Sequence, residues 1–179
     1  MDTGLCVAVD VNLPTGYDPA ARLCGAERIE VSTLDELEAN LARGRTAFIL
    51  LMADRYDTSP TWLTLEQVAP LAAAAGVPVI VDAAADYPAV PNPYLTAGAD
   101  LVAYSGGKIL RGPQGGGLLL GRSDLLLAAA ANAAPNHAFG RPLKVGKDIA
   151  VGMVVAVDAL LNRRDVAVRM NQNIARYSH

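Results

Sequence analysis

Short apolar runs alternate along the chain with segments whose apolar residues recur every three or four positions. Runs rich in Val, Ile and Leu are typical of strands buried on both faces, and the wider spacing is typical of amphipathic helices. This alternation predicts an α/β fold of three layers, α/β/α, with a mostly parallel sheet. The predicted strands cover residues 5–9, 27–31, 46–52, 77–81, 100–104 and 116–120.

Two of the predicted helices begin with a capping box, in which two residues three positions apart cap each other's backbone. Thr33 and Glu36 form the capping box of one helix, and Thr64 and Gln67 form the capping box of a second. Gly76 suits the end of the second helix, because glycine readily adopts the left-handed conformation found there. Further helices are predicted over residues 19–24, 94–98, 123–131 and about 148–164.

Composition narrows the class of protein. The chain has 179 residues, of which 52% are hydrophobic and 18% charged, so it can bury a sizeable core and is not disordered. Its formal net charge of −3 offers no general basic surface for nucleic acid. The two cysteines lack metal-ligand or redox spacing. We find neither a signal peptide nor an apolar run of membrane-spanning length, and we expect a soluble, cytoplasmic protein without a membrane partner.

A polar residue follows each of two consecutive predicted strands. Asp82 comes directly after the apolar run 79–81, and Lys108 follows the next strand after the sequence Ser-Gly-Gly. Open α/β sheets bind ligands at the carboxyl ends of their strands. An aspartate and a lysine are the two groups that pyridoxal phosphate (PLP) requires. The lysine amine forms a Schiff base with the aldehyde, and the carboxylate keeps the pyridine nitrogen protonated.

Neighbouring residues fit the same cofactor. The Ser105 hydroxyl can reach a phosphate, the two glycines after it allow close approach of the backbone to a ligand, and the small Ala84 leaves room for a flat ring. Taken alone, Lys108 also fits a surface lysine in a glycine turn, and Asp82 fits a turn cap. Together the two favour a cofactor site. Asp86 could cap a turn equally well, so we assign it no catalytic role.

Two loops after Lys108 each allow two interpretations. The glycine-rich segment 112–117 could present backbone N–H groups to an anion, or it could simply lead back into the sheet. The segment 140–147 carries Arg141, Lys144 and Lys147, which would suit a carboxylate or phosphate of the substrate. A solvated surface loop accounts for these three cations equally well.

With these residues in view, the chain resembles the selenocysteine synthase (seryl-tRNA selenium transferase)-like group of fold-type-I PLP-dependent enzymes. That group includes ammonia-lyases that act on amino sugar acids. The resemblance covers nearly the whole chain. It is specific because the segment around Lys108 occurs together with the later basic segment. The matching segments are residues 16–18, 77–85, 98–102, 105–114 and 140–147.

The resemblance implies that Lys108 is the Schiff-base lysine, Asp82 the partner of the pyridinium and Ser105 a contact on the phosphate side. It also implies an antiparallel strand over residues 116–120 in an otherwise parallel sheet of seven strands. Members of the group are longer than this chain, so the resemblance implies truncation at both ends. Residues 1–147 would be a partial PLP-binding large domain, and residues 148–179 a long helix leading to a missing small domain.

We therefore predict a PLP-dependent lyase or transferase that acts on an amino acid or amino sugar acid through Lys108. The freed Lys108 amine would take the α-proton, and Arg141, Lys144 and Lys147 would hold a substrate anion. The alternative is a catalytically silent fragment that serves as an oligomeric or interaction module. In both cases we expect a homo-oligomer, and the acidic charge weighs against nucleic acid. A nucleotide-binding module would need a glycine fingerprint that the chain lacks.

Overall fold

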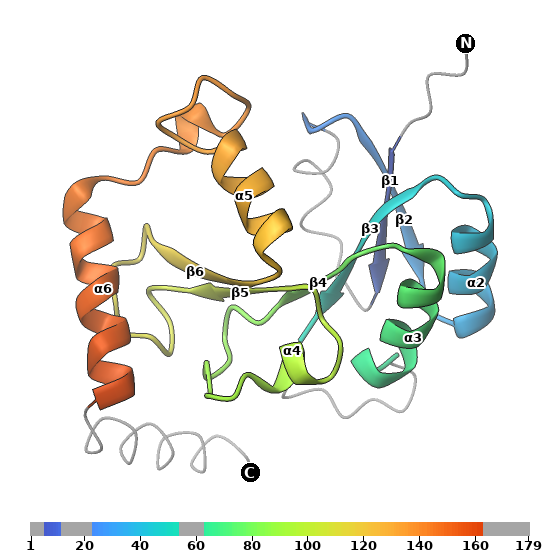
Figure 1. Ribbon diagram of the computed structural model, residues 1–179, viewed down its shortest axis with the longest axis horizontal. Helices are drawn as coiled ribbons and strands as arrows, with labels where there is room; N and C mark the ends of the chain where they lie inside the picture. Colours follow the sequence, from blue (N-terminus) through green and yellow to red (C-terminus); the bar gives the residue numbers. More distant parts are fainter. Residues whose placement is uncertain (1–5, 12–22, 54–62, 163–179) are drawn as a thin grey trace.

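The computed structural model describes residues 6–11, 23–53 and 63–162. Six strands in this part of the chain form one sheet, in the order β2-β1-β3-β4-β5-β6 (Figure 1). The first five are parallel, and β6 is antiparallel to β5. The predicted antiparallel strand is confirmed, although the described residues hold six strands where the resemblance implies seven. The strands are β1 (Cys6–Val11), β2 (Ala26–Val31), β3 (Thr46–Met52), β4 (Val79–Asp82), β5 (Leu101–Ser105) and β6 (Gly117–Gly121).

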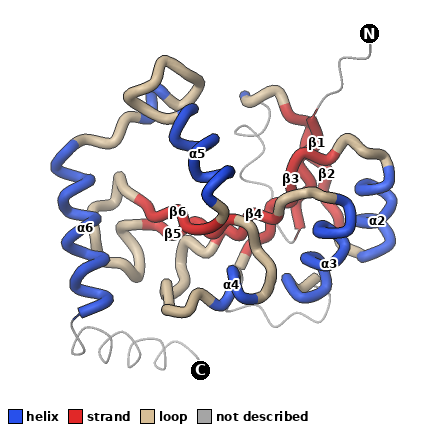
Figure 2. The backbone as a smooth tube through the Cα atoms, viewed as in Figure 1, coloured by secondary structure: helices blue, strands red, loops and turns tan. Residues whose placement is uncertain are grey.

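Helices pack on the sheet in the predicted α/β/α arrangement (Figure 2). Helices α2 and α3 pack against each other, and Figure 1 shows α4 below β5 and α5 above β6. None of the helices in the described ranges is long and apolar enough to cross a bilayer. The helices are α2 (Leu34–Ala42), α3 (Leu65–Ala75), α4 (Pro93–Thr96), α5 (Ser123–Asn132), α6 (Lys147–Asn162) and the 3₁₀ helix η1 (Arg141–Leu143).

Both predicted capping boxes are present. At the start of α2, the Glu36 N–H donates to Thr33 Oγ1 over 3.3 Å, and Glu36 Oε2 accepts from the N–H groups of Ser32 and Thr33 over 2.8 and 3.2 Å. The bond from Ser32 contributes most to lowering the pKa of the exposed Glu36 carboxyl. At the start of α3, the Thr64 N–H donates to Gln67 over 2.9 Å.

The end of α3 explains why β4 begins later than predicted. Gly76 ends the helix in the left-handed conformation, with φ of 67°. The next N–H, of Val77, still donates to the Ala72 carbonyl over 3.0 Å, so this residue belongs to the helix cap rather than to the sheet. Strand β4 therefore starts after Pro78, at Val79. The first-strand prediction matches β1, and the predicted helix over residues 19–24 lies almost entirely outside the described residues.

The core lies between one face of the sheet and the helices that pack on it. In the sheet register Ile49 pairs with Val79, Leu51 with Val81 and Val81 with Val102, so these buried side chains point to the same face of the sheet. Helix α6 contributes Met153 and Leu160, which are both 8% exposed. The largest fully buried side chains are Leu37, Ile49, Val68, Val79, Val81 and Val102.

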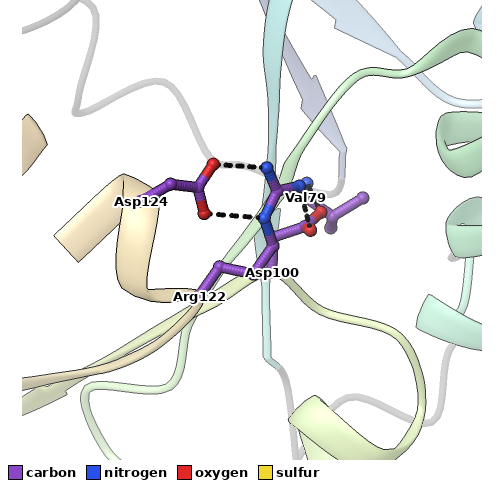
Figure 3. Close-up of polar contacts among 4 residues, drawn as sticks. All are labelled: Val79, Asp100, Arg122 and Asp124. Atoms are coloured by element: carbon purple, nitrogen blue, oxygen red, sulfur yellow. Dashed lines mark hydrogen bonds and ion pairs between the residues drawn. The ribbon is translucent and has the colours of Figure 1, made fainter. Parts of the chain in front are cut away.

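A polar cluster joins β4, β5 and β6 at the amino ends of β4 and β5 (Figure 3). Asp100 accepts from the Val79 N–H with one oxygen and from Arg122 Nη1 with the other, both over 2.8 Å. Arg122 also donates to Asp124 through Nε and Nη2, over 3.0 and 2.6 Å. The two bonds with Asp124 contribute most to raising the pKa of Arg122, and they lower the pKa of the Asp124 carboxyl. The cluster fixes the three strands at the end opposite to Lys108.

Candidate active site

Asp82 is the last residue of β4 and lies between Met52 of β3 and Ala103 of β5 in the sheet register. Its side chain is half-buried. The backbone N–H of Ala84 donates to its Oδ1 over 3.0 Å, so the carboxylate does cap the turn that follows the strand. Its second oxygen has no hydrogen-bond partner in the described part of the chain, and one acceptor therefore stays available beside the strand end.

The turn after β4 is fastened to the end of β5. The Ala83 N–H donates to the Ala103 carbonyl over 2.9 Å, and the Ser105 N–H donates to the Ala84 carbonyl over 3.4 Å. These bonds bring three of the predicted site residues, Asp82, Ala84 and Ser105, to the same edge of the sheet. Ser105 and Ala84 are half-buried, as is Asp82.

Lys108 stands three residues beyond the end of β5, on a closed loop. The Gly106 N–H donates to the Gly116 carbonyl over 2.9 Å, and the Gly112 N–H donates to the Gly106 carbonyl over 2.7 Å. The Arg111 N–H donates to the Lys108 carbonyl over 3.0 Å, and Arg111 has a positive φ of 54°. The backbone of the loop is thereby fixed, while the Lys108 side chain is exposed and has no ion pair with any described residue.

The structure gives the two glycines before Lys108 a packing role within the protein. A Cβ on Gly106 would lie 2.5 Å from Met153 Sδ, and one on Gly107 would lie 2.7 Å from Gln114 Cγ. Protein atoms, rather than a space left for a ligand, thus occupy the volume that a side chain would fill. The glycines are needed because the loop packs tightly on α6 and folds back on itself.

The second glycine-rich segment, residues 112–117, leads back into the sheet. The N–H groups of Gly112 and Gly116 donate inside the loop, to Gly106 and Pro113 respectively. Gly117 then pairs with Ser105 as the first residue of β6. These contacts favour the structural interpretation of the segment over anion binding.

Two of the predicted basic residues come from the segment after α5, and the third begins α6, the helix on which the Lys108 loop packs. Arg141 is in η1, Lys144 is in the loop after it, and Lys147 begins α6. The segment is fastened to α5, since the Gly140 N–H donates to the Asn132 carbonyl over 2.8 Å. Figure 1 shows η1 near the far end of α5, whereas the loop between β5 and β6 passes beside α6. The contacts in the described residues do not bring these cations to Asp82 or Lys108.

Arg141 nevertheless differs from the two lysines. Lys144 and Lys147 are exposed, whereas Arg141 is half-buried. Its Nε atom is buried and has no hydrogen-bond partner among the described residues. A buried donor without a partner is costly, so this atom is suited to an acceptor that arrives from outside.

A buried carboxyl group, to which we assigned no catalytic role from the sequence, lies at the end of the turn after β4. Asp86 is 4% exposed and accepts from the hydroxyl of Tyr94, on α4. From the same helix end, Asn92 Nδ2 donates to the hydroxyl of the buried Tyr104 over 2.8 Å. Asp86 ends a turn and Tyr94 lies eight residues later, in α4. No sequence pattern predicts a contact at this spacing.

An apolar groove of about 400 Å³ lies between α6 and the first residues of β6. It contains none of the predicted site residues, so it is distinct from the strand-end site. Its lining consists of Gly117, Leu118, Met153, Val154, Val157, Asp158 and Leu161.

Comparisons with known proteins agree with this architecture. The aminotransferase class-V family profile matches residues 25–135, which include Asp82 and Lys108. A 5'-C-glycyluridine monooxygenase-decarboxylase from a Streptomyces species is 34% identical over 140 residues, 75% of this chain and 34% of that protein. A D-glucosaminate-6-phosphate ammonia lyase from Salmonella typhimurium is 31% identical over 144 residues, 78% of this chain and 37% of that protein.

A solved D-glucosaminate-6-phosphate ammonia-lyase has the same fold. It superposes with a TM-score of 0.75 at 27% identity, over 89% of this chain and 44% of that chain. The predicted resemblance to ammonia-lyases and the predicted fold are confirmed. The chain spans about a third of the length of these curated relatives and less than half of the solved one.

Proposed function

The chain belongs to the aminotransferase class-V family, and on this premise we propose that it carries the PLP site of a lyase or transferase acting on an amino acid or amino sugar acid. The family and its lyase relatives imply PLP as the cofactor. One observation carries the proposal. Asp82 ends β4 and Lys108 follows β5, and these adjacent parallel strands present their carboxyl ends at the edge where such sheets bind ligands.

The groups at this edge fit the chemistry of PLP. One carboxylate oxygen of Asp82 has no hydrogen-bond partner among the described residues, the Lys108 amine is exposed, and Ser105 stands three residues before Lys108 in the chain. Asp82 would face the pyridine nitrogen, Lys108 would bond to the aldehyde carbon, and Ser105 would donate to the phosphate. Ala84 would leave space for the ring. When bound, PLP withdraws electrons from the α-carbon of an amino substrate.

The residues of the chain have separate tasks in the proposed reaction. Once the substrate amine has taken the place of Lys108 on the cofactor, the freed Lys108 Nζ would accept the proton from the substrate α-carbon. Asp82 accepts from the Ala84 N–H over 3.0 Å, which would orient its carboxylate toward the pyridine nitrogen. A β-substituent of the substrate would then leave with its bonding electrons as a double bond forms between the α- and β-carbons.

The proposal also includes a binding site for an anionic group of the substrate. Arg141, Lys144 and Lys147 are the candidates to hold it, and Arg141 is the strongest of the three. A carboxylate or phosphate would provide an acceptor for its buried Nε, which has no hydrogen-bond partner in the part of the chain that the structure describes. Because the described contacts leave these cations apart from Lys108, binding of the anion would require the basic segment and the strand ends to face one substrate.

Covalent labelling tests the assignment of Lys108. The chain has only three lysines, at positions 108, 144 and 147. After incubation with PLP and reduction with borohydride, peptide mass spectrometry should find the pyridoxyl group on Lys108 at stoichiometric level. Lys144 and Lys147 serve as internal controls for surface modification. The label and the accompanying visible absorbance should vanish in Lys108→Arg, which keeps the charge but cannot form the bond. Equal labelling of all three lysines, or a spectrum unchanged by Lys108→Arg, would refute the site.

A second function is favoured by the surface of α6. Four large apolar side chains of this helix are exposed, and a groove lies along its side. We propose that a second copy of the chain covers this surface, which would also serve an oligomeric module without catalysis. Light scattering with and without PLP separates the two functions. A cofactor-independent oligomer in which Lys108 takes no label favours the silent module. A monomer in the absence of PLP counts against it.

A further inference from the structure

A chain of hydrogen bonds runs from helix α4 to the candidate site. The hydroxyl of Tyr94 donates to the buried carboxyl of Asp86. The Asp86 N–H donates to the Ala83 carbonyl over 2.9 Å and closes the turn after β4. Inside that turn, the Ala84 N–H donates to Asp82 Oδ1 over 3.0 Å. The orientation of the Asp82 carboxylate thus depends on a turn whose last residue is anchored in the interior.

The same short helix also holds the neighbouring strand. Asn92 caps α4, because its Oδ1 accepts from the N–H groups of Tyr94 and Leu95 over 3.1 and 3.2 Å. Its amide Nδ2 then donates to the hydroxyl of Tyr104, which is 3% exposed and directly precedes Ser105. One helix end therefore anchors both the turn after β4 and the last residues of β5.

We propose that Asp86 is a positioning residue, which with Tyr94 holds the Ala83–Asp86 turn so that the Ala84 N–H fixes the Asp82 carboxylate for the cofactor. This inference rests on the proposed function, since it takes Asp82 as the partner of the pyridine nitrogen. A buried carboxyl group is costly unless it is bonded. A need for a rigid turn would explain why the Asp86 carboxyl is buried beneath it. Fixed supporting contacts of this kind are what keep a binding residue in one orientation.

Amide hydrogen exchange of the cofactor-free protein tests the positioning role directly. In Asp86→Ala, exchange at Ala84 and Ser105 should become about tenfold faster, as expected from the loss of one hydrogen bond's worth of stability. Asp86→Asn keeps an acceptor for the Tyr94 hydroxyl and should exchange nearly as the parent does. Tyr94→Phe leaves the carboxyl group in place and should act in the same direction as Asp86→Ala. The double variant should show little added effect, because the two residues share one interaction.

Arg122→Gln is the matched control, because it weakens β4, β5 and β6 at their other end. It should leave exchange at Ala84 unchanged. Titration with PLP gives the second readout: affinity should fall about tenfold in Asp86→Ala and recover in Asp86→Asn, with labelling at saturation still on Lys108.

Unchanged exchange at Ala84 in both Asp86→Ala and Tyr94→Phe would overturn the inference, as would equal acceleration in Arg122→Gln. If Asp86→Ala fails to fold, Tyr94→Phe decides. A parent protein that takes no PLP refutes the proposed function, whereas the exchange result stands by itself.

Discussion

Gly106 lies where β5 turns into the loop that carries Lys108, and it has almost no free space around its α-carbon. A Cβ there would lie 2.5 Å from Met153 Sδ, 2.6 Å from the Pro113 carbonyl oxygen and 2.7 Å from the Gly116 carbonyl oxygen. The methionine side chain could move, but the two carbonyl oxygens belong to the fixed backbone of the loop. The position of Lys108 thus depends on the absence of a single methyl group two residues earlier.

Replacing Gly106 with alanine should destabilise the protein by about 1–3 kcal/mol, the usual cost of overpacking a filled site. Urea unfolding measures this loss. Adding Met153→Ala should recover only part of it, because both carbonyl oxygens remain. Gly115→Ala is the control in the same loop, since the nearest contact there is the mobile Cδ1 of Ile149, at 3.1 Å. A loss in Gly115→Ala as large as that in Gly106→Ala would contradict this account.

At the scale of helices and strands, the sequence predicted the features that depend on residues close together in the chain. The capping boxes and the apolar runs predicted α2, α3 and all of β3, because each depends on residues within one turn or one strand. The approximate place of Asp82 at a strand end followed from the same pattern. The sequence did not predict interactions between residues that are far apart in the chain. Arg122 reaches Asp100 22 residues earlier, and the basic segment lies against α5, and both depend on how the helices and strands pack together.

The Arg122 cluster should make the stability of the sheet depend on pH. The bonds with Arg122 lower the pKa of Asp124, so their stabilising effect is present above the ordinary aspartate pKa of about 3.9 and is lost as the pH falls through the lower value. Arg122→Gln should therefore lower the melting temperature at neutral pH, and the difference from the parent should shrink in acid. The difference should also shrink in high salt, since Arg122 and Asp124 are exposed. A difference that persists undiminished in acid would rule out the Asp124 interaction as its source.

At the scale of the whole molecule, helix α6 is apolar on two sides. One side of α6 packs on the sheet and on the Lys108 loop through Met153 and Leu160. Its other side exposes Val151, Val154 and Val155, at 63%, 69% and 62%. These three recur at helical spacing, so they form a stripe rather than scattered exposures. A helix with apolar residues on opposite sides is expected to be covered on both.

Placing a charge in this stripe should separate the proposed copies. Val154 lines the groove beside β6 and is the most exposed of the three valines, so Val154→Lys removes apolar contact without disturbing the core. Light scattering over a range of concentrations should show the parent as an oligomer and Val154→Lys as a monomer, with the same circular dichroism spectrum. Ala39→Lys, at an exposed position on α2, adds the same charge elsewhere and should leave the mass unchanged. If the parent is monomeric throughout, or if Val154→Lys keeps the oligomer, a second copy does not cover α6.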